Sequence, residues 1–148
     1  MIKDYELARY VATAIAQLKE YDTQLHGLFS HNGSARGQAF ETLLRRAIAY
    51  QNAVLPRNKL GKDIQIGDWG FEVKTTGSSR IRTNVSSIIG DKDQSGLYLL
   101  VMFKYGTCDV KRILYGTIPQ SAWALPKNGK TQIAVLMNTD SLGYLEVY

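Results

Sequence analysis

The segment from Asp63 to Lys74 alternates apolar and polar residues in two short runs separated by a turn. Ile64-Gln65-Ile66 forms the first run and Phe71-Glu72-Val73 the second, with the alternation typical of half-buried strands. Gly67-Asp68-Trp69-Gly70 between them supplies turn residues. The pattern predicts a β-hairpin, so the chain must build a sheet around this segment.

Three charged side chains of this hairpin are predicted to lie close together. Alternation puts Glu72 and Lys74 on the face opposite Phe71 and Val73, while Asp63 begins the partner strand. Such a group suits phosphodiester hydrolysis, because carboxylates hold Mg²⁺ or Mn²⁺ and a lysine orients the attacking water or stabilises the transition state. The alternative interpretation is a solvated hairpin whose Glu72 and Lys74 face water.

The rest of the chain predicts helices first and then mostly strands. Two amphipathic helices are expected, joined by a polar connector over His26–Arg36, and the continuous apolar run that follows the hairpin favours a buried central strand. The simplest architecture is an α/β (α+β) domain with a central mixed sheet flanked by helices. The expected helices span Asp4–Asp22 and Ala35–Asn52, the strands 97–103, 110–115, 132–137 and 144–147, and a short helical turn Pro119–Trp123.

Glu41 is a further candidate for the site. It lies beside the apolar stripe of the second predicted helix and would serve as another metal or water ligand if it pointed toward the hairpin. An equally good interpretation is a helix-surface carboxylate near Arg45, four residues further on.

Bulk properties narrow the class of protein. A length of 148 residues indicates one domain, and a net charge of +5 with an isoelectric point near 9.3 permits a polyanionic partner. The single Cys108 excludes an intramolecular disulfide and a cysteine-rich zinc site, which fits a reducing cytoplasm. No signal peptide or membrane-spanning run is expected from the sequence.

Several pieces of the chain occur in the order and spacing of a known nuclease group. The chain resembles the PD-(D/E)xK nuclease superfamily and, within it, the PvuII-like type II restriction endonucleases. Lys62 stands where the superfamily motif commonly has proline. The pieces that carry the resemblance are Glu20-Tyr21, Leu28-Phe29 with Asn32-Gly33, Val54-Leu55-Pro56-Arg57, and Asp63 through Lys74.

The resemblance implies a restriction-endonuclease-like core with Mg²⁺ as the cofactor, for which Mn²⁺ can substitute. Asp63, Glu72 and the backbone carbonyl of Val73 would bind the metal, and Lys74 would be the catalytic lysine. The protein would be a homodimer that cuts both strands of a short palindromic DNA site. Residues 1–34 would form a helical dimerisation and DNA-clamp region, and residues 35–148 the catalytic core.

Base-reading residues do not follow from the resemblance. PvuII-like enzymes carry a histidine cluster after the catalytic strand, and this chain has arginine and asparagine there instead, which bind bases or phosphates. A second basic loop is also a candidate for DNA contact. The candidates are Arg80, Arg82, Thr83 and Asn84 in the first segment and Lys127, Asn128 and Lys130 in the second.

Two other functions stay open at this point. A structure-selective nuclease such as a Holliday junction resolvase is supported by the helix that carries Glu41, although resolvases begin with such a helix and more than thirty residues precede it here. A catalytically inactive DNA-binding module is the other alternative. The combination of Asp63, Glu72 and Lys74 argues against it, because binding alone does not require these residues.

Overall fold

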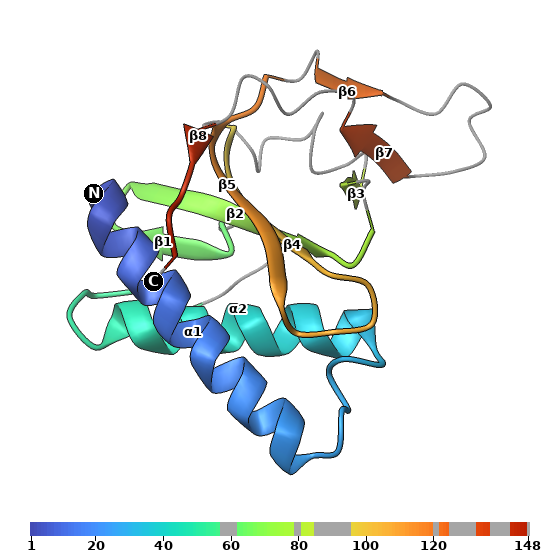
Figure 1. Cartoon of the computed structure of the whole chain (residues 1–148). Helices are drawn as coiled ribbons and strands as arrows, with labels where there is room; N and C mark the ends of the chain where they lie inside the picture. Colours follow the sequence, from blue (N-terminus) through green and yellow to red (C-terminus); the bar gives the residue numbers. More distant parts are fainter. Residues whose placement is uncertain are drawn as a thin grey trace.

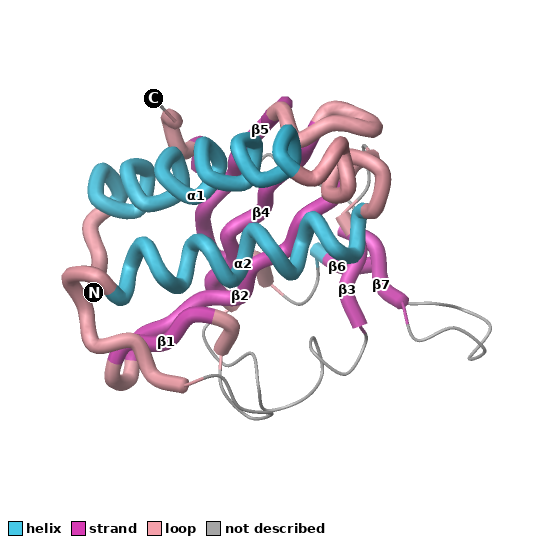
Figure 2. Tube along the Cα trace, turned by 90° about the horizontal axis from the view of Figure 1, so that it is seen from below, coloured by secondary structure: helices cyan, strands magenta, loops and turns pink. Residues whose placement is uncertain are grey.

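The computed structural model describes residues 1–56, 62–78, 81–84, 96–119, 122–124, 133–136 and 143–147, with the backbone alone for 82–84 and 133–136. It is an α+β fold with two helices, a five-stranded mixed sheet and a smaller three-stranded sheet (Figure 1). Both helices lie against the same face of the larger sheet (Figure 2).

The two helices form where the sequence predicts them, with small differences at their ends. Helix α1 spans Asp4–Gln24, and helix α2 spans Gly33–Ala49. Helix α2 begins at Asn32, whose side-chain oxygen accepts a hydrogen bond from the Ala35 N–H at 3.0 Å. The apolar stripes of both helices are buried in one core with the sheet, namely Leu7, Val11, Ala14, Ile15 and Leu18 of α1 and Phe40, Leu43, Leu44 and Ile48 of α2.

The predicted hairpin is confirmed, and it forms one edge of the larger sheet. Strand β1 (Ile64–Ile66) pairs antiparallel with β2 (Trp69–Thr76), with Ile64 opposite Phe71. The sheet order is β1-β2-β4-β5-β8, in which β2 and β4 are parallel and the other pairs antiparallel. The remaining strands are β4 (Leu97–Phe103), which is buried as predicted, β5 (Val110–Thr117) and β8 (Gly143–Tyr144).

The shortest strands of the two sheets correct two sequence predictions, the first of them in the smaller sheet. It contains β3 (Arg82–Asn84), β7 (Ile133–Leu136) and β6 (Trp123–Ala124) in the order β3-β7-β6. Trp123 was expected in a helical turn, but it pairs with β7, and its ring packs 5.6 Å from that of Tyr98. In the larger sheet, the strand expected over 144–147 is present but shorter, because β8 spans Gly143–Tyr144 and residues 145–147 lie outside it.

The two faces of the larger sheet have different coverings. Phe71 and Val73 of β2 pack with the helices, whereas Tyr98 and Leu100 of β4 belong to a second core that includes Trp123 of the smaller sheet. The expectation of helices flanking the sheet therefore holds for one face only among the described residues. The face opposite the helices is the one toward which Glu72 and Lys74 project.

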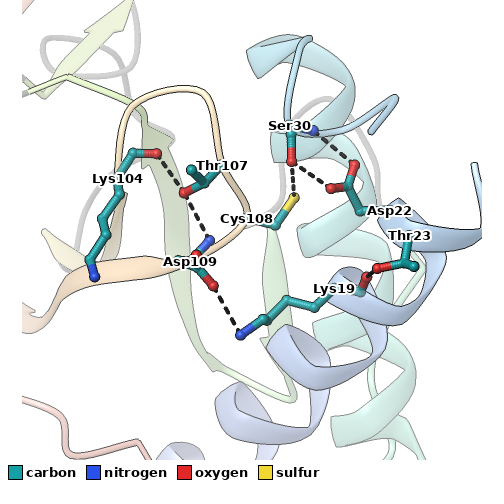
Figure 3. A network of polar contacts seen from close by, with 8 residues as sticks. All are labelled: Lys19, Asp22, Thr23, Ser30, Lys104, Thr107, Cys108 and Asp109. Carbon is teal, nitrogen blue, oxygen red and sulfur yellow. Dashed lines mark hydrogen bonds and ion pairs between the residues drawn. The ribbon is translucent and has the colours of Figure 1, made fainter. Parts of the chain in front are cut away.

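A polar network closes the connector between the helices (Figure 3). The Asp22 carboxylate accepts hydrogen bonds from the backbone N–H groups of Phe29 and Ser30 at 2.8 and 2.9 Å and another from the Ser30 hydroxyl. Partial burial raises the pKa of Asp22, but these hydrogen bonds outweigh it, and the pKa is lowered below its ordinary value of 3.8. Ser30 Oγ also lies 3.7 Å from Sγ of the buried Cys108, which ties the connector to the β4–β5 loop.

Replacing Asp22 by alanine should lower the free energy of unfolding at pH 7 by about 1–3 kcal/mol, because two partly buried N–H groups lose their acceptor. Because the folded-state pKa is lowered, the carboxylate stabilises the fold above about pH 4, and this contribution is lost as the pH falls through the folded-state pKa. Urea unfolding of both proteins across that range measures the difference.

Asp109→Asn is the matched control in the same network. Its carboxylate pairs with Lys19 at 3.0 Å, but both side chains are about half exposed, so the change should stay below about 1 kcal/mol. Equal losses in the two variants would contradict a special role for Asp22.

Candidate active site

Strand β2 extends beyond the end of β1, and the candidate site lies where it does so. The pairing of β1 with β2 begins at Ile64, opposite Phe71. Asp63 therefore lies just before the paired part of β1, and no strand residue pairs with β2 beyond it on that side among the described residues. The Asp63 carboxylate takes the place of a strand partner and accepts a hydrogen bond from the Val73 N–H at 2.8 Å. Asp63 is 9% exposed, so this carboxylate is fixed in a buried position.

The hairpin turn allows this close pairing. A Cβ atom at Gly70 would lie 2.5 Å from the Ile64 carbonyl oxygen, so a larger residue would force β1 and β2 apart. Gly67 has φ +60, a left-handed conformation that favours glycine. The turn glycines therefore set the register that brings Asp63 beside the second strand.

Arg45 of helix α2 fixes the backbone of Asp63. Its Nη2 donates to the Asp63 carbonyl oxygen, and its Nη1 donates to the Leu55 carbonyl oxygen at 3.1 Å. Glu41 pairs with this arginine at 3.6 Å, as in the helix-surface interpretation, although its side chain is only 15% exposed. Glu41 therefore contacts the group that positions Asp63. Among the described residues it does not form a three-carboxylate cluster with Asp63 and Glu72.

Glu72 contacts Asp63 in a buried setting. It is 9% exposed, and burial, a hydrogen bond to Asp63 and the negative charge of Asp63 together raise its pKa to about 8. The positive charges of Lys74 and Lys62 act in the opposite direction. Two carboxyl groups that share one small space attract a cation, because both cannot be ionised there without one.

The predicted alternation along β2 is confirmed. Glu72 and Lys74 lie opposite Tyr98 and Leu100 of β4, on the face away from the helices, whereas Phe71 and Val73 join the helix core. Lys74 is half-buried and close enough to influence Glu72. The hairpin therefore brings Asp63, Glu72 and Lys74 together.

Lys62 is a charged residue of the site that sequence reasoning treated only as a departure from a motif. Its side-chain carbons come within 3.1 Å of the position that a Cβ on Gly70 would take, and its charge acts on Glu72. The signal in the sequence was its place directly before Asp63, at the start of the predicted hairpin. The charge of Lys62 thus acts on Glu72 in addition to that of Lys74.

The donor atoms fit a hard divalent cation. Asp63 and Glu72 supply oxygen atoms, and the C=O of a strand residue points to the same edge as its N–H, so the Val73 carbonyl points toward the Asp63 side. An oxygen-only set of this kind suits Mg²⁺ or Mn²⁺. Within the described ranges no three His, Cys, Asp or Glu side chains gather in one group. The candidate metal ligands there are therefore two carboxylates and one backbone carbonyl.

The predicted DNA contacts fall largely outside this description. Arg80, Lys127, Asn128 and Lys130 lie outside the described residues. Arg82, Thr83 and Asn84 form strand β3, which pairs with β7. Strand β3 contacts β2, so the described part of the first candidate segment lies near the site strand.

Comparisons with family models, with curated proteins and with solved structures found no match to this chain. A search of the described helices found none with the length and apolar character needed to cross a membrane.

Replacing Glu72 by glutamine should stabilise the metal-free protein, increasingly so as the pH rises. The folded-state pKa of about 8 lies above the ordinary value of 4.5, so the wild-type protein loses stability as the pH rises between these values. Glutamine has no proton to release, and the gain at pH 8 should be on the order of 4 kcal/mol. Urea midpoints in chelator from pH 4.5 to 8 measure it.

Glu20→Gln removes an exposed carboxylate of α1 and serves as the control, with little effect at any pH. A Glu72→Gln protein that tracks the wild type across the whole range would show that Lys62 and Lys74 already compensate the Glu72 charge.

Proposed function

We propose that the protein is a metal-dependent DNA endonuclease of the type II restriction class, acting as a homodimer on a short palindromic site. The observation that supports this most is the buried contact between Asp63 and Glu72, with Lys74 on the same strand face. A solvated hairpin would leave these side chains in water. Instead both carboxylates are 9% exposed, which a structural role would not require.

Each residue of the site has a definite task in this proposal. Asp63 and Glu72 hold the divalent ion together with the Val73 carbonyl, and the fixed backbone of Asp63 keeps the first of these ligands in place. When bound, the ion would polarise the phosphate and make a bound water more acidic. Lys74 projects from the same face as Glu72, where its ammonium orients the attacking water and stabilises negative charge on the phosphate.

Homodimerisation follows from the proposed substrate. A palindromic duplex has twofold symmetry, so two identical chains related by the same axis can each address one strand. The net charge of +5 favours approach to the phosphate backbone. A cytoplasmic location belongs to the same proposal, because a restriction enzyme acts on DNA inside the cell.

The purified protein is expected to cut a large unmethylated DNA of known sequence into discrete fragments with Mg²⁺ and to leave it whole in chelator. Gel analysis and sequencing of the fragment ends measure this, and one shared end sequence would define the site. If linear duplex stays whole with Mg²⁺ while a four-way junction is cut, the resolvase alternative replaces the restriction proposal. If neither is cut, a binding module remains.

Lys74→Ala should reduce cleavage by at least about 100-fold while DNA binding and the thermal midpoint change little, because the lysine acts on the reacting phosphate. Lys111→Ala removes an equal charge from an exposed position on β5 and is the matched control, which should cleave like the wild type. Parallel loss of cleavage, binding and stability in Lys74→Ala would identify a structural lysine.

A further inference from the structure

A pocket separate from the candidate active site lies at the carboxyl end of strand β2. It has a volume of about 450 Å³ and is formed where the start of helix α2, the end of β2 and the β4–β5 loop meet. No residue of the proposed catalytic group lines it. Its wall includes Arg36, Gly33, Thr76, Gly77, Ser78 and Tyr105.

Arg36 is the unusual residue of this pocket, because a charged side chain is only 4% exposed there. Its Nη1 donates to the Thr107 carbonyl oxygen at 3.0 Å, and its guanidinium lies 4.7 Å from the centre of the Phe103 ring. The buried Nε has no hydrogen-bond partner among the described residues, and no carboxylate in that part of the chain pairs with the arginine. A buried guanidinium with an unused donor favours an anion beside it.

The remaining walls of the pocket are also suited to an anion. Arg36 belongs to the first turn of the 17-residue helix α2, where the helix dipole is positive. Nη2 lies 2.7 Å from the position that a Cβ on Gly77 would occupy and 3.6 Å from the one on Gly33. The guanidinium therefore reaches across the pocket to the Thr76-Gly77-Ser78 turn, in which the Ser78 N–H donates to Thr76 Oγ1 at 3.1 Å.

We propose that this pocket binds a phosphate oxyanion, with Arg36 as its central donor. Arginine presents several N–H groups in a planar fork that matches phosphate oxygens. The β4–β5 loop holds the arginine in position through Thr107, the residue whose hydroxyl and N–H also brace that loop (Figure 3). Resting on the proposed nuclease function, the phosphate is a backbone phosphodiester of the DNA near the cleaved bond.

The distance along β2 fits this assignment. Gly77 follows Lys74 by three residues, which is roughly 10 Å of extended chain. Phosphates follow one another along a DNA strand every ~3.4 Å of helix axis, so the pocket would contact a phosphate within a few nucleotides of the reacting one. Arg36 is then a positioning residue that fixes the register of DNA on the enzyme.

The test compares Arg36→Gln with Arg46→Gln, which removes the same charge from an exposed position on the same helix. All measurements are made in chelator, without cleavage, on folded full-length protein. Arg36→Gln should weaken binding of a labelled 20-base-pair duplex about tenfold and reduce the salt slope of its affinity by about 0.9, whereas Arg46→Gln should change affinity less than about twofold.

Inorganic phosphate is the second probe. Replacing chloride by phosphate at equal ionic strength should raise the wild-type thermal midpoint by about 3 °C once phosphate exceeds its dissociation constant tenfold. The rise should persist in Arg46→Gln and disappear in Arg36→Gln. A rise that depends on Arg36 without any effect on duplex binding would assign the pocket to free phosphate and reject the DNA source.

A glycine pair keeps the test decisive if Arg36→Gln does not fold. Gly77→Ala adds a methyl group against Nη2 at 2.7 Å, whereas Gly33→Ala adds the same group at an ordinary 3.6 Å. Gly77→Ala should lose phosphate and duplex binding, and Gly33→Ala should keep both. Wild-type binding in Gly77→Ala, or equal duplex affinity and an unchanged phosphate response in Arg36→Gln and Arg46→Gln, would overturn the proposal.

These outcomes are separate from those that test the nuclease function. Absence of Mg²⁺-dependent cleavage would refute the nuclease while leaving Arg36-dependent phosphate binding in place. Normal cleavage together with Arg36-independent binding would refute only the pocket.

Discussion

The attachment of Asp63 is the interaction on which the candidate site depends. Its carbonyl oxygen accepts a hydrogen bond from Arg45, and its carboxylate accepts one from the Val73 N–H at 2.8 Å. The first bond connects helix α2 to the hairpin, and the second continues the β1–β2 pairing beyond the last paired residues. One residue thus joins the helix layer, the sheet edge and the site, so disturbing the packing of α2 on the sheet should also displace the first carboxylate.

This precise placement has an energetic consequence for the metal-free protein. Glu72 is held against Asp63 in a buried position, and its raised pKa means that the charged form is disfavoured there. A cation between the two groups would reverse the preference. Local instability that a ligand relieves is common at functional sites and uncommon at purely structural ones, because nothing in the fold itself rewards a buried carboxyl pair.

Local pattern predicted the elements that position the site. The hairpin, both helices and the central strand β4 follow from short-range periodicity, and alternation alone placed Glu72 and Lys74 on one face. Trp123 was misassigned because its strand depends on pairing with β7, a partner distant in the chain. The pairing of Glu41 with Arg45 was weighed correctly as one of two possibilities, but the attachment of Arg45 to Asp63 is a tertiary contact that spacing does not reveal.

The apolar periodicity of helix α2 also indicates that Arg36 is buried. It lies four residues before Phe40, on the buried stripe of α2, so helical periodicity already places this charged residue toward the core. A charged side chain at a core position requires either contact with solvent or a partner group. Arg36 is only 4% exposed, and one backbone carbonyl accepts a hydrogen bond from it. Helix α2 therefore serves the site at both ends. Arg45 near its carboxyl end fixes the backbone of Asp63, and Arg36 lies at its amino end. If both proposals hold, a single rigid helix would set the spacing between the reacting bond and the backbone contact that aligns it.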